Sequence, residues 1–155
     1  MEKFIENITE AEKIIKTADH LIYITFPLIQ DKKLLLKILQ QIKTAVAKCI
    51  NSILQYDYLY KRISLYTEPK RNFETFQRKC APRADIIANE IKLIQELFFL
   101  SDKHKNSPME FVRNEKVVIL SENSEPITIN LEKIKEFLIM SKNILTKTRN
   151  TITKN

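Results

Sequence analysis

Glycine is absent from this chain of 155 residues. Glycine normally supplies the positive-φ positions of tight β-hairpins, of helix C-terminal caps and of phosphate-cradling loops. Its absence therefore argues against a β-rich fold and against a Gly-rich nucleotide-binding loop. Helices depend least on glycine, so the composition favours a helical protein.

Cysteine and histidine are both scarce, with two residues of each. Cys49 and Cys80 form no Cys-x-x-Cys pair, so we expect neither a zinc site nor a disulfide framework, and a reducing, cytoplasmic location fits. Cys49 falls on an apolar stripe and is interpreted as a core side chain. Cys80 has basic neighbours that would stabilise a thiolate if the sulfur were exposed, but a structural thiol is the preferred interpretation. His20 and His104 lie among lysines, which disfavour imidazolium and metal alike, so we expect surface or capping roles.

Long hydrophobic runs are also missing. The longest stretch without a formal charge runs from His20 to Gln30 and is broken by Pro27, which falls short of the ~18 residues that a spanning helix requires. The N-terminus is charged from Glu2 onward and lacks the apolar core of a secretory signal. We therefore expect no association with a membrane.

Catalytic and cofactor signatures are absent as well. The sequence has no H-E-x-x-H, G-x-S-x-G, Walker or dinucleotide-binding motif, so no catalytic residue, metal ligand or small-molecule cofactor is predicted. Apolar residues make up 44% of the chain and charged residues 29%, the balance of an ordinary soluble globular protein. A chain of this length is sufficient for one core, so we expect a single domain over residues 1–155.

Apolar side chains recur at helical spacing in the first part of the chain. One stripe predicts a helix over residues 2–25 that ends or kinks at Pro27, because proline cannot donate to the carbonyl four residues earlier. A second stripe predicts a helix from an Asp31 N-cap to about Leu65. The first stripe is Phe4, Ile8, Ala11, Ile15, Ala18, Ile22 and Thr25, and the second is Leu35, Ile38, Ile42, Val46, Cys49, Ile53, Tyr56, Tyr60 and Ile63.

Shorter elements follow. Asn72 is expected to cap a helix through about Cys80, and a further helix is expected from Asp85 to about Lys105. Residues 107–114 begin with Ser-Pro and place a glutamate at the third helical position, a capping signature that predicts a short helix.

The last part of the chain mixes β and helical signals. Over residues 116–129, two β-branched runs on either side of a turn-like segment predict a small β-hairpin. Asn130 is expected to cap a final helix. The predicted fold class is mostly α, a helical bundle of four or five helices with a small β-hairpin before the C-terminal helix.

The formal net charge of +7 is unevenly distributed. Residues 61–83 carry seven basic and two acidic side chains, and a basic tail over residues 142–155 carries four basic side chains and no acidic one. Residues 84–141 carry seven basic and ten acidic side chains, and residues 1–60 carry eight and seven. The excess positive charge therefore lies in two short segments.

Residues 56–83, the basic aromatic segment, combine these cations with several rings. Rings that stack on bases beside cations that neutralise phosphates are what binding of single-stranded RNA requires. The alternative is a solvated basic helix end that follows a buried stripe. Asp57 lies in the same segment and is interpreted as the partner of Lys61, four residues later. The predicted nucleic-acid-binding residues are Lys61, Arg62, Lys70, Arg71, Arg78, Lys79 and Arg83 for phosphates and Tyr58 and Tyr66 for stacking.

Two apolar residues fall on otherwise polar helical lines. Phe99 and Ile139 are therefore candidates for a partner surface, although docking of the hairpin could cover either of them.

Two long antiparallel helices followed by shorter ones, over residues 1–105, resemble the HEPN bundle. This is a family of small helical proteins that often act on RNA or pair with nucleotidyltransferases. Active members carry an Arg-x4-6-His motif, and here neither residues 97–99 before His104 nor residues 13–15 before His20 include an arginine. The resemblance therefore implies a member without nuclease activity, or a scaffolding member, and a homodimer.

The sequence as a whole predicts a binding or adaptor protein, with RNA or a ribonucleoprotein as the leading partner. Two alternatives stay open. One is a homodimeric protein–protein interaction module, and the other is a metal-independent RNase related to the HEPN bundle.

Overall fold

The computed structural model of the protein describes residues 2–107, 109–121 and 124–153. The elements in chain order are α1 (Lys3–His20), the π-helical turn η1 (Leu21–Thr25), α2 (Phe26–Ile29), α3 (Leu34–Leu59), α4 (Pro69–Thr75), the π-helical turn η2 (Phe76–Cys80), α5 (Ala88–Lys105), β1 (Met109–Arg113), β2 (Lys116–Ser121), β3 (Ser124–Ile129) and α6 (Leu131–Thr153). Because α1, η1 and α2 are continuous, as are α4 and η2, these residues form five helical rods. A mostly helical fold with β structure before the C-terminal helix is thus confirmed.

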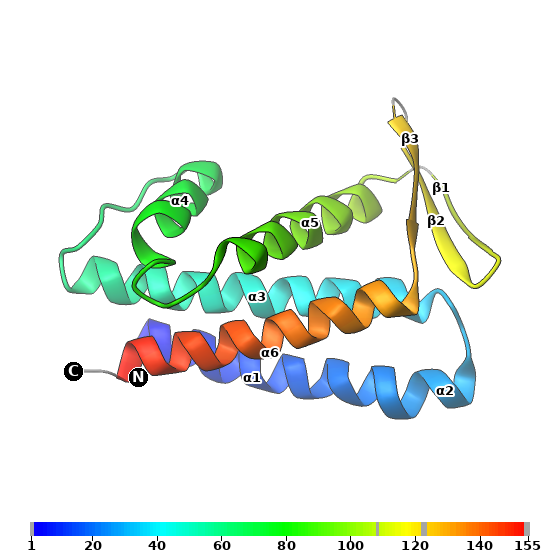
Figure 1. The fold of residues 1–155 in the computed structure, drawn as a ribbon, viewed down its shortest axis with the longest axis horizontal. Coiled ribbons are helices and arrows are strands. Elements are labelled where there is room, and N and C mark those ends of the chain that lie inside the picture. The colour runs from blue at the N-terminus through cyan, green and yellow to red at the C-terminus, as the bar shows by residue number, and fades with distance from the viewer. Residues whose placement is uncertain (1, 108, 122–123, 154–155) are drawn as a thin grey trace.

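Three long helices, α1, α3 and α6, lie side by side and form the body of the molecule (Figure 1). Helices α4 and α5 lie on the side of α3 that is away from α1, and the sheet stands at one end of the molecule. Both chain termini lie near the other end. Among the described residues, no helix has both the length and the apolar character that crossing a membrane demands.

The contact between α1 and α3 is the most extensive in the fold. Its centre includes Ala11 and Ala18, both fully buried, and side chains this small allow the two helices to approach closely. The Ser52 hydroxyl of α3 donates a hydrogen bond of 2.7 Å to the Phe4 carbonyl of α1. The predicted stripe of the first helix is confirmed from Phe4 to Ile22, and Thr25 at its end is only half-buried.

The irregularity predicted at Pro27 lies in the turn just before it. Pro27 has no N–H for an α-helical bond to the Tyr23 carbonyl, and the chain widens into the π-helical turn η1 at this point. Helical structure nevertheless continues to Ile29. It ends where Gln30 adopts a left-handed conformation and donates its N–H to the Phe26 carbonyl at 2.7 Å.

Helix α3 is shorter than predicted. Asp31 accepts the Lys33 N–H at 3.0 Å near its start, but the helix ends at Leu59 and not at about Leu65. Lys61 adopts a left-handed conformation, and the Arg62 N–H donates to the Asp57 carbonyl at 2.9 Å, which is the closing bond of a Schellman motif. The apolar stripe on the helix therefore stops at Tyr56, although Ile63, the last member of the predicted stripe, is buried beyond the helix end. Tyr60, predicted to be buried, is exposed.

The α4–η2 rod and α5 differ from the prediction only at their starts. The α4 helix begins at Pro69, with Glu68 as N-cap, so Asn72 lies inside the helix instead of capping it. The end predicted at Cys80 is confirmed, because η2 stops there. Helix α5 begins three residues later than predicted and ends at Lys105 as expected.

The short helix predicted over residues 107–114 is wrong, because this segment contributes the strand β1. Arg113 pairs with Lys116, so only Asn114 and Glu115 connect β1 to β2, and both have positive φ angles of 50° and 67°. Two such residues form a type I′ hairpin turn. The sheet therefore has three antiparallel strands in the order β1-β2-β3, where the sequence predicted a hairpin of two.

The capping signature that suggested this helix serves the sheet instead. The Ser107 hydroxyl lies within hydrogen-bond distance of two carbonyl oxygens, that of Leu120 in β2 at 2.8 Å and that of Met109 at 2.7 Å, and can donate its one proton to either. Pro108 lies outside the described residues. Residues 122 and 123 of the predicted hairpin also lie outside them, whereas the strand residues at Ile127 to Ile129 are confirmed.

Helix α6 follows the sheet directly and runs back along the bundle. The Asn130 side-chain oxygen accepts the Lys133 N–H at 2.9 Å, as the predicted cap requires. Most of the predicted basic tail belongs to this helix, which extends to Thr153.

Residues other than glycine occupy the left-handed backbone positions where glycine is usually found. Among the described residues, those with a positive φ are Gln30, Lys61, Asp85, Asn114 and Glu115. All five lie at a helix end or in the β1–β2 turn. A residue with a Cβ atom is strained in this conformation, so each position costs folding free energy that glycine would not cost.

The replacement Gln30→Gly is expected to raise the free energy of unfolding by about 1 kcal/mol, because it removes this strain. Gln95 is an exposed residue in the interior of α5, so the matched change Gln95→Gly is expected to lower it by about 1 kcal/mol. Urea denaturation followed by circular dichroism measures both. Equal destabilisation by the two changes would contradict the left-handed assignment.

Candidate nucleic-acid interface

The structure places the seven predicted phosphate-binding residues in the connection between α3 and α5. Lys61 and Arg62 follow the end of α3, and Arg83 lies in the turn before α5. The other four lie at the two ends of the α4–η2 rod: Lys70 and Arg71 in its first turn, Arg78 and Lys79 in η2. This connection occupies the end of the molecule opposite the sheet (Figure 1).

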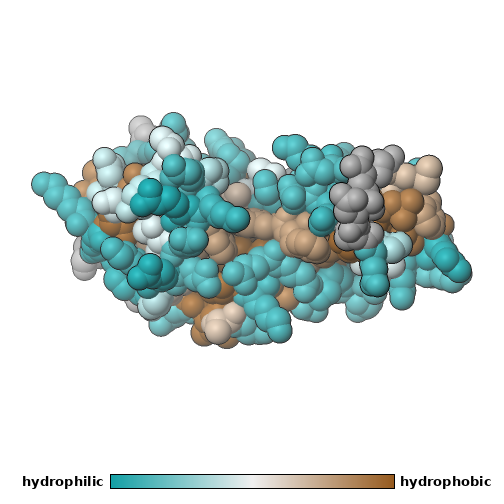
Figure 2. Space-filling view, turned by 90° about the horizontal axis from the view of Figure 1, so that it is seen from above, coloured by the Kyte–Doolittle hydropathy of each residue, from teal (hydrophilic) through white to brown (hydrophobic). Residues whose placement is uncertain are grey.

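The apolar side of the α4–η2 rod fixes its position. Phe76 and Cys80 are fully buried, and the Phe73 ring lies 5.9 Å from the Phe98 ring of α5, measured between centroids. Because these side chains face the core, the charged residues of the rod face solvent. Seen from above, the end of the molecule that holds α4 is mainly hydrophilic, and brown residues gather farther along toward the sheet (Figure 2).

Four of the seven cations are exposed and form no ion pair with any described carboxylate. They are Lys61, Lys70, Arg78 and Lys79, hereafter the unpaired cations. Each of them is therefore available to pair with a negatively charged partner.

The basic tail behaves differently, although its sequence looks equally cationic. Lys142 contacts Asp19 at 2.5 Å and Lys147 contacts Glu90 at 2.5 Å. Arg149 forms an ion pair with Glu12, and this pair lowers the pKa of the Glu12 carboxyl below its usual value, chiefly through the hydrogen bond. The tail therefore uses its charge to hold α6 against α1 and α5.

Tyr66 and Arg71 form a stacked pair. The Arg71 guanidinium carbon lies 3.8 Å from the centroid of the Tyr66 ring, a distance typical of a close cation–π contact. The Asn72 side chain accepts the Tyr66 N–H at 2.8 Å and donates to the Tyr66 carbonyl at 2.8 Å, which fixes the backbone beneath the ring. A ring and a guanidinium plane oriented in this way can form a stacking platform for a base. The second predicted stacking residue, Tyr58, is 55% exposed on the last turns of α3.

Asp57 has different partners from the one predicted. Its fully buried carboxylate forms ion pairs with Arg62, at 3.3 Å from Nη1, and with Arg83, and none with Lys61. The i,i+4 pair fails because α3 ends at Leu59, and Lys61 then lies in a left-handed turn that no longer follows the helix. Arg62 and Arg83 thus have a structural contact that the unpaired cations lack.

Tyr60 is the site residue that sequence reasoning missed, whereas for Asp57 it predicted the wrong partner. The Tyr60 ring is 52% exposed and lies 5.2 Å from the Arg62 guanidinium carbon. Tyr60 keeps helical spacing with Tyr56, so the stripe gave no sign that the helix had ended. The position of Asp57 among aromatic and basic residues indicated that it has a cationic partner. Its second partner, Arg83, could not be identified because it is 26 residues away in the sequence.

Both cysteines are buried and free, as the structural interpretation predicted. Burial raises the pKa of Cys49 to about 12. Burial also raises the pKa of Cys80, and the neighbouring Asp57 carboxylate adds to this effect. Both side chains are therefore thiols at neutral pH. Of the histidines, His20 is exposed, and His104 contacts the Glu110 carboxylate.

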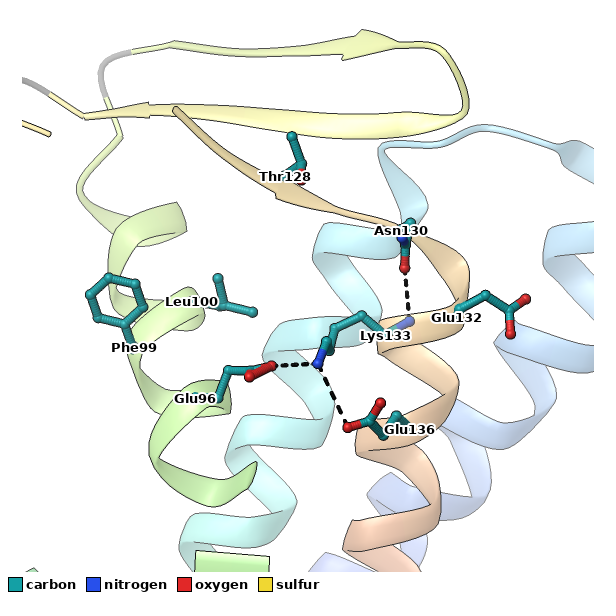
Figure 3. A pocket seen from close by; sticks show the side chains of 8 residues that line it. All are labelled: Glu96, Phe99, Leu100, Thr128, Asn130, Glu132, Lys133 and Glu136. Atoms are coloured by element: carbon teal, nitrogen blue, oxygen red, sulfur yellow. Dashed lines mark hydrogen bonds and ion pairs between the residues drawn. The ribbon is translucent and has the colours of Figure 1, made fainter. Parts of the chain in front are cut away.

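The predicted partner residues Phe99 and Ile139 are 53% and 58% exposed, so docking of the sheet covers neither. Phe99 lines a pocket of about 470 Å³ between α5 and α6, although its ring points away from α6 (Figure 3). The Lys133 side chain lines the pocket, and its ammonium group contacts Glu96 at 2.7 Å and Glu136 at 3.6 Å. The hydrogen bond with Glu96 is the main reason why the pKa of Lys133 is raised. Because three glutamates and one lysine line this pocket, its net charge is negative, which does not suit a nucleic acid.

No protein-family model matches the chain, and a search of the curated proteins finds no match either.

The replacement Arg83→Gln is expected to lower the free energy of unfolding by about 2 kcal/mol, because it leaves the buried Asp57 carboxylate with one partially exposed partner. The matched change Arg78→Gln removes an exposed arginine that forms no ion pair with a described carboxylate. It is expected to change the free energy of unfolding by less than about 0.5 kcal/mol. Urea titrations of both variants test this difference, and equal effects would count against a structural role for Arg83.

Proposed function

We infer that the protein binds single-stranded RNA, alone or in a ribonucleoprotein, through the surface formed by the connection between α3 and α5. The observation that carries this proposal is the difference between the two basic segments. The tail's Lys142, Lys147 and Arg149 pair with acids of other elements, whereas the unpaired cations have no such partner among the residues that the structure describes. A polyanion would supply the missing negative charge.

Aromatic side chains beside the cations favour a single strand over a duplex. Bases of a single strand are free to stack on rings and on guanidinium planes, and each stacked base contributes about 1–3 kcal/mol. Tyr66 with Arg71, and the exposed Tyr58 and Tyr60, provide such planes on the same connection or at the end of α3 next to it. The proposed mode of action is binding, with phosphates on the cations and bases on the rings.

Replacement of all four unpaired cations by glutamine is expected to weaken binding of an oligouridine of about 12 nucleotides roughly a hundredfold at low salt. The slope of log K against log salt should become less steep by about 3, since each lost phosphate contact on a single strand contributes about 0.7. Fluorescence anisotropy over a salt series measures both quantities.

A control variant has the same net charge but keeps the surface intact. It has glutamine in place of Lys13, Lys37, Lys105 and Lys116, four exposed residues that lie on other elements. This variant should retain wild-type affinity, and an equal loss in both variants would show that only net charge matters. The RNA recovered from the wild-type protein is run on a gel, because cleavage would favour the RNase alternative over a binding role.

A homodimeric interaction module is the second candidate, and the exposed Phe99 and Ile139 favour it. Replacing both with glutamate is expected to shift the sedimentation of the protein at about 10 µM from dimer to monomer, because charge opposes burial of that surface. Leu28→Glu, a change at an 82% exposed residue of α2, is the control and should leave the dimer intact. A wild-type protein that sediments as a monomer rules this candidate out.

A further inference from the structure

Two arginines meet on one oxygen of a buried carboxylate at the edge of the proposed RNA surface. The Oδ1 atom of Asp57 contacts Nη1 of Arg62 at 3.3 Å and also Nη2 of Arg83. Because both contacts are to the same atom, the two guanidinium groups are neighbours. The Asp57 side chain is 1% exposed, whereas those of Arg62 and Arg83 are 43% and 38% exposed. The arginines therefore lie between the core and solvent.

The backbone around both arginines is fixed by helix ends. The Arg62 N–H donates to the Asp57 carbonyl, so Asp57 holds Arg62 through its main chain and through its side chain. Arg83 lies in a turn that the Ile86 N–H closes by donating to the Ala81 carbonyl at 3.0 Å, with Asp85 in a left-handed conformation. Side chains held on fixed backbone lose less conformational entropy when they bind a ligand.

The charges around Asp57 do not balance. The cluster has two guanidinium charges and one carboxylate, and the Cys80 thiol beside it adds none because burial and Asp57 keep it protonated. One carboxylate oxygen cannot satisfy the five N–H donors that each guanidinium carries. The cluster thus has a net charge of +1 and unused donors at the surface, and one monoanionic oxyanion would neutralise it.

We propose that Arg62 and Arg83 form a subsite for a single phosphodiester of the bound RNA, with buried Asp57 as the positioning residue that sets the two guanidinium groups side by side. This inference rests on the proposed function. Paired guanidinium groups match the oxygens of a phosphate in bidentate geometry, which lysine cannot reproduce. The Tyr60 ring lies against Arg62 at the cluster and is placed to stack on the adjoining base.

The positioning role of Asp57 predicts a change in RNA affinity opposite in sign to the change that net charge alone predicts. Asp57→Asn raises the charge of the cluster from +1 to +2, so an unstructured pair of cations would bind RNA more tightly. The subsite instead requires ordered guanidinium groups, so the affinity for RNA is expected to fall roughly tenfold. The slope of log K against log salt should become less steep by about 0.7, the contribution of one phosphate contact. Partial unfolding alone would lower the apparent affinity and leave the slope unchanged. Higher affinity in the variant would overturn the positioning role.

A second variant retains the charge balance around the buried Asp57 carboxylate. Arg62→Lys combined with Arg83→Lys retains both charges on partially exposed side chains, and its affinity for oligouridine is expected to fall roughly tenfold with the salt slope unchanged. The control pair, Arg113→Lys with Arg149→Lys, changes two arginines that lie outside the proposed RNA surface and should bind as the wild type does. If the first pair binds RNA as tightly as the control pair, the subsite does not exist while the proposed function stands. If the wild type binds no RNA, both fail.

Discussion

The burial of α3 on several sides is the constraint on which the rest of the structure depends. It packs against α1, α6, α5 and η2, and its apolar side chains are buried from Leu35 to Tyr56. A helix enclosed in this way carries its polar residues into the core, and Asp57 near its end is one of them. Because a buried carboxylate requires cationic partners, the chain must bring arginines to this point. The α3–α5 connection does so with Arg62 and Arg83.

The two basic segments illustrate how similar composition can serve different purposes. Exposed ion pairs contribute little stability individually, but those of the tail join α6 to two other helices and fix its orientation. In the connection, Arg62 and Arg83 contact the buried Asp57 carboxylate but remain partially exposed, Arg71 stacks on Tyr66, and the remaining cations face solvent. Folding thus gives seven similar residues different surroundings.

The periodic helices could be predicted from the sequence, because one residue pattern determines which face is buried. The end of α3 could not, since Tyr60 and Ile63 keep helical spacing although Lys61 has already left the helix. Strand β1 was missed because its pairing with β2 depends on tertiary hydrogen bonds that a local capping signature does not reveal. The crowding of cations between residues 61 and 83 was visible from the start. Their division into paired and unpaired groups was not, because the partner of Arg83 is distant in sequence.

The ion pairs that join the two ends of the chain also bear on the order of folding. Lys142 and Asp19 are 123 residues apart, and Arg149 and Glu12 are 137 apart, so closing these contacts restricts nearly the whole polypeptide. The α1–α3 hairpin closes a far shorter loop. Because the entropy cost of closure rises with loop length and distant contacts slow folding, we expect the α1–α3 hairpin to form before α6 docks on it. The contacts of α6 with both helices would then complete the native bundle.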